Sequence, residues 1–345
     1  MKRKQKKKEN RWSGIQSLLT DPQPKRGQTP KKEVWKINKA TLWYYPSPHK
    51  KYNTPLFLIY SLINESYILD LSPGISMIES YVKEGYDVYL LDFGKLGYED
   101  GDVSLDDYIS IIQKGVKRAL IHADSKDISL VGYCLGGTLA VIYAAIAQEP
   151  VKNLILFAPP INFSETPIMK KWFASLKNKE INIEDLFDQH TVVPARMVEL
   201  VLRLAISPVT FSSYLSLLHH ANDREAVKKW RLFHRWVKSH VPFAGVTLKQ
   251  LINEVVRDNK LINNKLVIKG EPVLLSNIEA NALVISTEGD QLVPEILTLP
   301  LLEQLGSLDK TYKREKGGHV TLAMTGKIPK FLQTWLAARS ELVEK

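Results

Sequence analysis

The chain has 345 residues, 44% of them hydrophobic, and 47 lysines and arginines against 37 acidic residues give it a formal net charge of +10. This length can bury a large core in one or two domains, and the composition is that of an ordinary globular protein. A single cysteine excludes an internal disulfide, no window reaches the roughly 18 apolar residues of a membrane span, and no apolar signal segment follows the charged N-terminus, so we expect a cytoplasmic protein.

The chain begins with a strongly basic stretch. "MKRKQKKKENR" contains seven lysines and arginines in eleven residues, and we expect residues 1–32 to form a solvated, disordered tail. The alternative is that this tail docks to an anionic surface such as nucleic acid, lipid or a polyanionic partner. Without the tail the charge is modest, and no zinc spacing, RNA-binding aromatic motif or Walker loop is present, so the whole protein is not expected to bind nucleic acid.

Residues 33–160 alternate between strand and helix patterns. "EVWKINKATLWYY" predicts a hairpin at a sheet edge, and the apolar run "PLFLIYS" predicts a strand buried on both faces. Strands are then expected at 86–94, 128–133 and 151–159, and helices at 74–84, 104–123 and 136–148, with Ser104 as the N-cap of the second. This alternation predicts a mostly parallel sheet flanked by helices.

The alternation stops in residues 161–276 and returns in 277–345. The middle region has long helical segments rich in Trp, Phe and Leu and no clear strands, so we expect a helical cap inserted after the sixth strand. "NALVIST" and "KTYKREK" then predict the last two strands, with helices at 294–305 and 328–342. The sheet core is therefore expected to comprise residues 33–160 and 277–345, with the cap as a separate domain.

The only cysteine lies in "GYCLGG", between a predicted strand and a predicted helix. A nucleophile on such a turn has a strained backbone, and glycines two positions to either side avoid a clash, here Gly132 and Gly136. We call residues 132–137 the elbow. The start of the helix favours a thiolate at Cys134, and the Leu135 amide can donate to an oxyanion. A lone cysteine is usually a small buried hydrophobe, but the surrounding pattern favours a nucleophile.

A thiol nucleophile needs a base and a group that orients the base. Among eight histidines, His319 stands out because it follows the last predicted strand in a two-glycine loop, "KGGHV". Asp290, in "EGDQLVP", follows the strand before it. The histidines of the cap lie on helical faces and are expected to pack or to be exposed.

A second oxyanion donor is expected from the loop after the third strand, "SLINESYILDL". The backbone of Leu62 or Ile63 is the candidate, and we select Ile63. Asp92 ends a strand at the same sheet edge, and we expect it to hold loops in place rather than to react.

With these motifs, residues 55–345 resemble the polyhydroxyalkanoate synthases, and within them the short catalytic subunits of the two-component classes. The resemblance is carried by "SLINESYILDLSPGISMIESYVKEGYDVYLLDFG", "GYCLGGTLAVIYAA", "VKNLILFAPPINF", "NKLINNKLVIKGEPVLLSNI", "EGDQLVP" and "GGHV". It implies an α/β-hydrolase fold with Cys134 as the acylated nucleophile, His319 as the base and Asp290 as the third member. The chain departs from the family in having Phe93 where a tryptophan is usual.

The resemblance implies an acyltransferase that polymerises (R)-3-hydroxyacyl-CoA, with 3-hydroxybutyryl-CoA as the expected substrate, and releases coenzyme A. It also implies a second synthase subunit, a homodimer or hetero-oligomer, and contact with the polyester granule in the cytoplasm. No dinucleotide fingerprint or metal cluster occurs in the sequence, so no metal and no bound cofactor are expected, coenzyme A being the leaving group.

Two alternatives stay open at the level of sequence. A cysteine hydrolase or thioesterase would share the same three residues and pass the acyl group to water. A non-catalytic granule- or nucleoid-associated protein would act through its basic tail, but it has no need of a complete nucleophile, base and acid.

Overall fold

The structure is a computed structural model that describes residues 25–164, 191–200 and 223–343. Most of the predicted basic tail lies outside the described residues, as do parts of the predicted cap. The division into tail, core and cap therefore stays a prediction.

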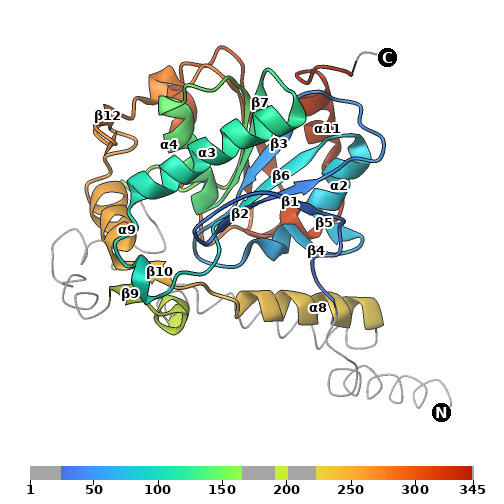
Figure 1. Ribbon diagram of the computed structural model, residues 1–345, viewed down its shortest axis with the longest axis horizontal. Coiled ribbons are helices and arrows are strands. Elements are labelled where there is room, and N and C mark those ends of the chain that lie inside the picture. Colours follow the sequence, from blue (N-terminus) through green and yellow to red (C-terminus); the bar gives the residue numbers. More distant parts are fainter. Residues whose placement is uncertain (1–24, 165–190, 201–222, 344–345) are drawn as a thin grey trace.

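An eight-stranded sheet forms the centre of the molecule (Figure 1). Its strand order is β1-β2-β6-β3-β7-β8-β13-β14, and β2 runs opposite to the other seven strands, which all point the same way. The strands are β1 (Lys32–Ile37), β2 (Ala40–Tyr45), β3 (Leu56–Ile59), β6 (Val88–Asp92), β7 (Ile128–Tyr133), β8 (Val151–Phe157), β13 (Asn281–Thr287) and β14 (Lys310–Glu315). The predicted edge hairpin, the mostly parallel sheet and all eight strands are confirmed.

Helices cover both faces of this sheet (Figure 1). Helices α3 (Leu105–Ala123) and α4 (Leu135–Ile146) contact each other on one face. Helices α2 (Met77–Glu84) and α11 (Lys330–Ala337) lie on the other, joined by a hydrogen bond from Gln333 Nε2 to Glu84 Oε1. With both faces covered, the central strands carry almost unbroken apolar side chains, and every residue of β3 is buried.

Local sequence signals define where these elements begin. Ser104 caps α3 as predicted: its hydroxyl accepts from the Asp107 amide, and the Asp107 carboxylate accepts from the Ser104 amide. This reciprocal capping box satisfies donors that the first helical turn cannot bond internally.

Two predicted helices near the C-terminus are wrong in extent. The one expected at 294–305 divides into a 3₁₀ turn (Glu295–Leu297) and the short α10 (Leu301–Gln304), because Pro300 has no amide proton to donate between them. The one expected at 328–342 ends at Ala337. Beyond it the backbone pairs with residues 51–53 instead, with Val343 N donating to Lys51 O.

Between β8 and β13 the described residues hold the long helix α8 (Arg224–Val237), which lies along the lower edge of the molecule in Figure 1. The region also contains α9 (Gly245–Gln250), a π-helical stretch (Leu251–Arg257) and a 3₁₀ turn (Leu275–Asn277). Two short antiparallel pairs, which the sequence pattern did not indicate, are β9 (Val192–Val193) with β10 (Phe243–Ala244), and β11 (Val267–Ile268) with β12 (Glu271–Pro272). Strands of two residues are too short to show a periodic pattern.

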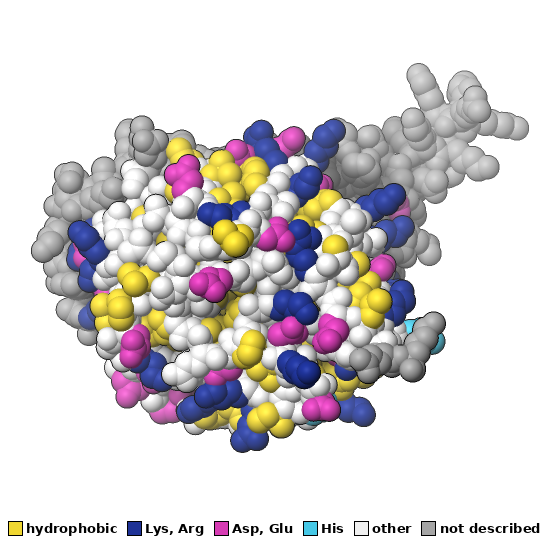
Figure 2. All heavy atoms as spheres, turned by 90° about the horizontal axis from the view of Figure 1, so that it is seen from above, with side chains coloured by type: hydrophobic (Ala, Val, Ile, Leu, Met, Phe, Trp, Pro, Cys, Tyr) yellow, Lys and Arg dark blue, Asp and Glu magenta, His cyan; other side chains and the backbone are white. Residues whose placement is uncertain are grey.

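The remaining short elements are the pair β4 (Asp70–Ser72) and β5 (Ile75–Ser76) and the 3₁₀ turns Ser66–Leu69, Tyr98–Asp100 and Leu322–Met324. None of the helices in the described ranges has the length and apolarity needed to cross a membrane. On the face shown in Figure 2, basic and acidic side chains are interspersed and hydrophobic ones form small groups.

Candidate active site

Cys134, Asp290 and His319 all follow strands that end at the same edge of the sheet. Cys134 comes directly after β7, Asp290 after β13 and His319 after β14. Strands β13 and β14 are parallel neighbours, and their two following loops are bonded, with Gly289 N donating to Gly317 O at 2.8 Å. The topology therefore brings together three residues that are up to 185 positions apart in the chain.

The elbow has the geometry that its sequence predicts. Cys134 has a φ of +54°, an unfavourable region for a residue with a side chain. A Cβ on Gly132 would lie 2.5 Å from the Gly137 Cα, and one on Gly136 would collide with the carbonyl oxygen of Ile59. Both glycines are therefore required by close backbone approach.

Asp290 and His319 form a directly hydrogen-bonded pair. His319 Nδ1 lies 2.7 Å from Asp290 Oδ2, and the other carboxylate oxygen accepts from the amides of Leu292 and Val293 at 3.0 and 2.8 Å. The Asp290 side chain is almost fully buried, whereas that of His319 is 14% exposed. The carboxylate is thus fixed by its own loop and fixes the orientation of the imidazole.

The Cys134 thiol is the other hydrogen-bond partner of the His319 side chain. Burial by itself would lower the pKa of His319, but the negative charge of Cys134, together with hydrogen bonds to Asp290 and to Cys134, raises it to about 10. At neutral pH the geometry therefore favours an imidazolium that faces both Cys134 and the Asp290 carboxylate.

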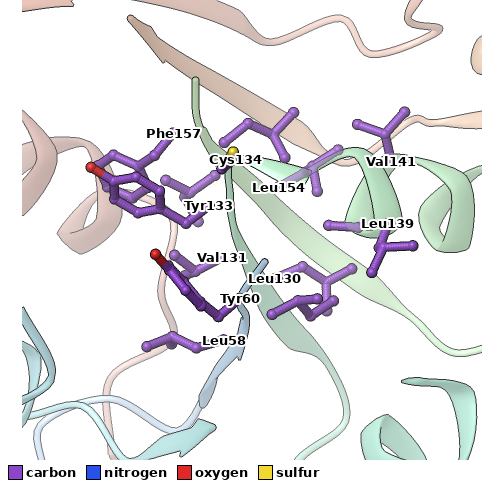
Figure 3. Close-up of a cluster of buried hydrophobic side chains, with 14 of the residues drawn as sticks. Leu58, Tyr60, Leu130, Val131, Tyr133, Cys134, Leu139, Val141, Leu154 and Phe157 are labelled. Carbon is purple, nitrogen blue, oxygen red and sulfur yellow. The ribbon is translucent and has the colours of Figure 1, made fainter. Parts of the chain in front are cut away.

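Tyr133 connects the elbow to the histidine loop, a role that the sequence patterns did not indicate. Its hydroxyl donates to the His319 carbonyl oxygen at 2.7 Å, and its ring is stacked on Phe157 with a centroid distance of 5.2 Å. Figure 3 shows Tyr133 next to Cys134 at the end of β7, with Phe157 behind it. Burial raises the pKa of Tyr133 far above its usual range, so the hydroxyl stays a donor.

The two predicted oxyanion donors differ in their surroundings. Leu135 is the first residue of α4, so no carbonyl of that helix accepts its amide proton. The Ile63 amide donates to Ser61 Oγ at 3.2 Å, and in this part of the chain it is the backbone of Ile59 and Tyr60 that touches the elbow. The role of Ile63 stays a prediction, and using its amide would require the bond to Ser61 to break.

A cavity of about 290 Å³ is lined mainly by residues of the loops that follow β3 and β6, and Cys134, Asp290 and His319 are not among its lining residues. Its lining includes Tyr60, Leu62, Asp92 and Val241. Asp92 accepts from the Gly94 amide at 3.0 Å, which agrees with a role in holding its loop. In the described ranges, no three His, Cys, Asp or Glu side chains are grouped in a way that could hold a metal ion.

The comparison with family models gives a match over residues 54–323, to the alpha/beta hydrolase fold. The chain belongs to this family. The match includes the elbow, Asp290 and His319, and it confirms the fold that the motifs indicate.

Named relatives show which members of this family the chain resembles. The chain is 31% identical over 91% of its length to the poly(3-hydroxyalkanoate) polymerase subunit PhaC of Haloferax mediterranei, of which it covers 65%. It is 28% identical over 92% of its length to PhaC of Allochromatium vinosum, of which it covers 90%. The chain thus spans about two thirds of the first of these relatives. The resemblance to polyhydroxyalkanoate synthases is confirmed.

A solved structure with the same fold is that of a soluble variant of monoglyceride lipase from Saccharomyces cerevisiae. It has a TM-score of 0.55 at 12% sequence identity, with 92% of this chain and 100% of that chain covered. At this identity the likeness shows the fold alone.

Proposed function

We propose that this protein is an acyltransferase that polymerises (R)-3-hydroxyacyl-CoA, with 3-hydroxybutyryl-CoA as its preferred substrate, into polyhydroxyalkanoate and releases coenzyme A. The observation that carries the proposal is a thiol on the elbow beside the hydrogen-bonded pair of His319 and Asp290. The names of relatives that align with more than nine tenths of the chain support a 3-hydroxyalkanoate monomer.

In the first step Cys134 Sγ attacks the thioester carbonyl. The Sγ–C bond forms and the C–S bond to coenzyme A breaks, while the protonated His319 gives its proton to the leaving thiolate. The amide of Leu135, with a second amide that we assign to Ile63, stabilises the negative charge on the carbonyl oxygen.

In the second step the 3-hydroxyl of the growing chain attacks the Cys134 thioester. Acylation removes the negative charge of Cys134, which is the strongest influence that raises the pKa of His319. The imidazole can then accept the hydroxyl proton as the Cys134 thiolate leaves, and the ion pair is restored. Asp290 orients His319 in both steps.

A thiol suits this reaction better than a hydroxyl. Transfer of an acyl group from one thioester to another has a free-energy change close to zero, so the acyl group stays activated for ester formation. A serine would give an oxyester, from which building another ester gains little. Water would end chain growth, so the site must exclude it.

The proposal includes partners and a location. We infer a second synthase subunit, assembly as a homodimer or hetero-oligomer, and association with the polyester granule in the cytoplasm. The basic tail is the segment suited to an anionic surface. No bound cofactor is required, since the thiol, the imidazole and coenzyme A as leaving group balance the reaction.

The deciding experiment incubates the full chain with 3-hydroxybutyryl-CoA, measures thiol release and analyses the acyl product. Insoluble polyester with released coenzyme A is expected, and Cys134→Ala should abolish both. Free 3-hydroxybutyrate would instead identify the alternative, a cysteine thioesterase. No thiol release, even with a small partner subunit added, would contradict the proposal.

A further inference from the structure

The loop that follows β3 is bonded to the segment that follows α8. We call residues 60–67 the β3 loop and residues 236–241 the α8 clamp. Glu65 N donates to Ser239 O at 3.1 Å, and Val241 N donates to Ile63 O at 3.0 Å. Between these bonds Asn64 pairs with His240 as an isolated antiparallel bridge. The α8 clamp therefore acts as a short extra strand along the β3 loop.

Side chains reinforce this pairing at the end of α8. The Trp236 indole Nε1–H donates to the Glu65 carbonyl oxygen at 2.9 Å, and Asn64 Nδ2 donates to the Trp236 carbonyl oxygen at 3.3 Å. Trp236 is 8% exposed. The carboxylate of Glu65 is further held by Arg26 at 3.2 Å and by Lys95 at 2.7 Å. Glu65 is thus fixed from several directions.

The β3 loop begins at the elbow. Gly136 packs against Ile59 and Tyr60 so closely that it has no room for a Cβ. In Figure 3 Tyr60 lies below Tyr133, on the same side of β7 as the Tyr133 ring. A shift of the β3 loop would therefore move the backbone that borders Cys134 and carries the second oxyanion donor assigned above.

We propose that Trp236 is a positioning residue through which the region containing α8 sets the β3 loop for acyl transfer at Cys134. This inference rests on the proposed acyl transfer, but not on the polyester product. An oxyanion donor displaced by about 1 Å can slow a reaction by up to about a hundredfold, and a donor that is loosened rather than removed should cost less.

The test uses 4-nitrophenyl acetate as a general acyl donor and the full chain. Trp236→Phe keeps an aromatic ring and removes the indole N–H. The burst of nitrophenolate that reports acylation of Cys134 should slow about tenfold. Alkylation of Cys134 by iodoacetamide, which forms no oxyanion, should keep its rate and its pH profile.

A matched control is available in Trp335→Phe. Trp335 is 7% exposed and its indole also makes one hydrogen bond, to Thr311 Oγ1 at 3.1 Å, but it lies on α11. This variant should show a normal burst. If the melting temperature of Trp236→Phe lies well below that of Trp335→Phe, Asn64→Ala is tested by the same criteria. This variant removes the other side-chain hydrogen bond between the β3 loop and the α8 clamp.

Each outcome has a distinct meaning. A burst of wild-type rate in Trp236→Phe, or alkylation that slows together with acylation, would overturn the positioning role. A wild-type chain that shows no burst at all would contradict the proposed acyl transfer itself, and the inference would fall with it.

Discussion

At the residue scale, the properties of His319 depend on its two neighbours. Asp290 and a thiolate at Cys134 each favour the protonated imidazole, and together they outweigh the cost of burying its charge. The imidazolium is expected to persist through neutral pH and to be lost as the pH rises through about 10. One group can therefore act as acid before acylation and as base after it.

This coupling predicts the rate of Cys134 alkylation at neutral pH. The imidazolium of His319 beside the thiol should promote attack by Cys134 on iodoacetamide at pH 7. His319→Ala should therefore slow this alkylation about tenfold at pH 7. His122→Ala, which removes a histidine hydrogen-bonded to Tyr89 on another part of the sheet, should not.

A second prediction concerns Tyr133. Tyr133→Phe removes the hydroxyl that holds the His319 carbonyl, so the imidazole should lose orientation and kcat should fall about five- to tenfold, with KM nearly unchanged. The pH dependence of Cys134 alkylation in Tyr133→Phe should also differ from that of the wild-type chain. The control is Tyr143→Phe on α4, which also loses one buried hydrogen bond of 2.7 Å, to Glu149 beyond the end of that helix. Equal kinetics of the two variants would contradict the role of Tyr133.

At the element scale, the site depends on where strands end and helices begin. Parallel strands β7, β13 and β14 place their following loops at one sheet edge, and α4 begins directly after Cys134. The neighbouring helix α3 packs against α4 in the same layer and carries none of the three candidate site residues. Its capping should therefore affect stability alone.

The variant Ser104→Ala tests this separation. Loss of the capping box should lower the free energy of unfolding by about 1 kcal/mol, measured by urea denaturation, without changing kcat. Ser110→Ala provides the comparison, because the Ser110 hydroxyl bonds only to the Asp106 carbonyl within the same helix. A fall in kcat for Ser104→Ala would show that α3 is coupled to the site.

At the scale of the whole molecule, Asn259 joins two distant segments of the long insertion between β8 and β13. This buried residue has a φ of +51°. Its side chain accepts from Phe163 N and donates to Asn162 Oδ1 and Ser164 Oγ, all within 3.0 Å. The beginning of the insertion is thereby joined to a segment about 100 residues later.

Asn259→Ala should therefore lower the free energy of unfolding by more than the cost of placing alanine at this positive φ. Three lost hydrogen bonds at about 1 kcal/mol each, added to about 1 kcal/mol for the backbone conformation, predict a loss of about 4 kcal/mol in the free energy of unfolding. Asn38→Ala isolates the conformational cost, because Asn38 is exposed and has a φ of +48°. It should lose only about 1 kcal/mol. Equal losses would show that the network contributes nothing.

The sequence alone was sufficient for the sheet and the elbow turn, because these depend on local signals. It also selected Cys134, Asp290 and His319, whose catalytic roles stay a prediction. Buried strands need apolar runs, a nucleophile turn needs glycines, and a helix needs a cap. Two helix ends were missed because Pro300 and pairing with residues 51–53 override an otherwise helical pattern.

Only the tertiary structure decided which backbone meets which side chain across the chain. The Tyr133 hydroxyl bonds to a carbonyl 186 residues away, and Trp236 bonds to one 171 residues away. Such bonds go to backbone atoms that every residue possesses, so no pattern of side chains can reveal them. The sequence determined the candidate reacting groups, and the tertiary structure decided what holds them in place.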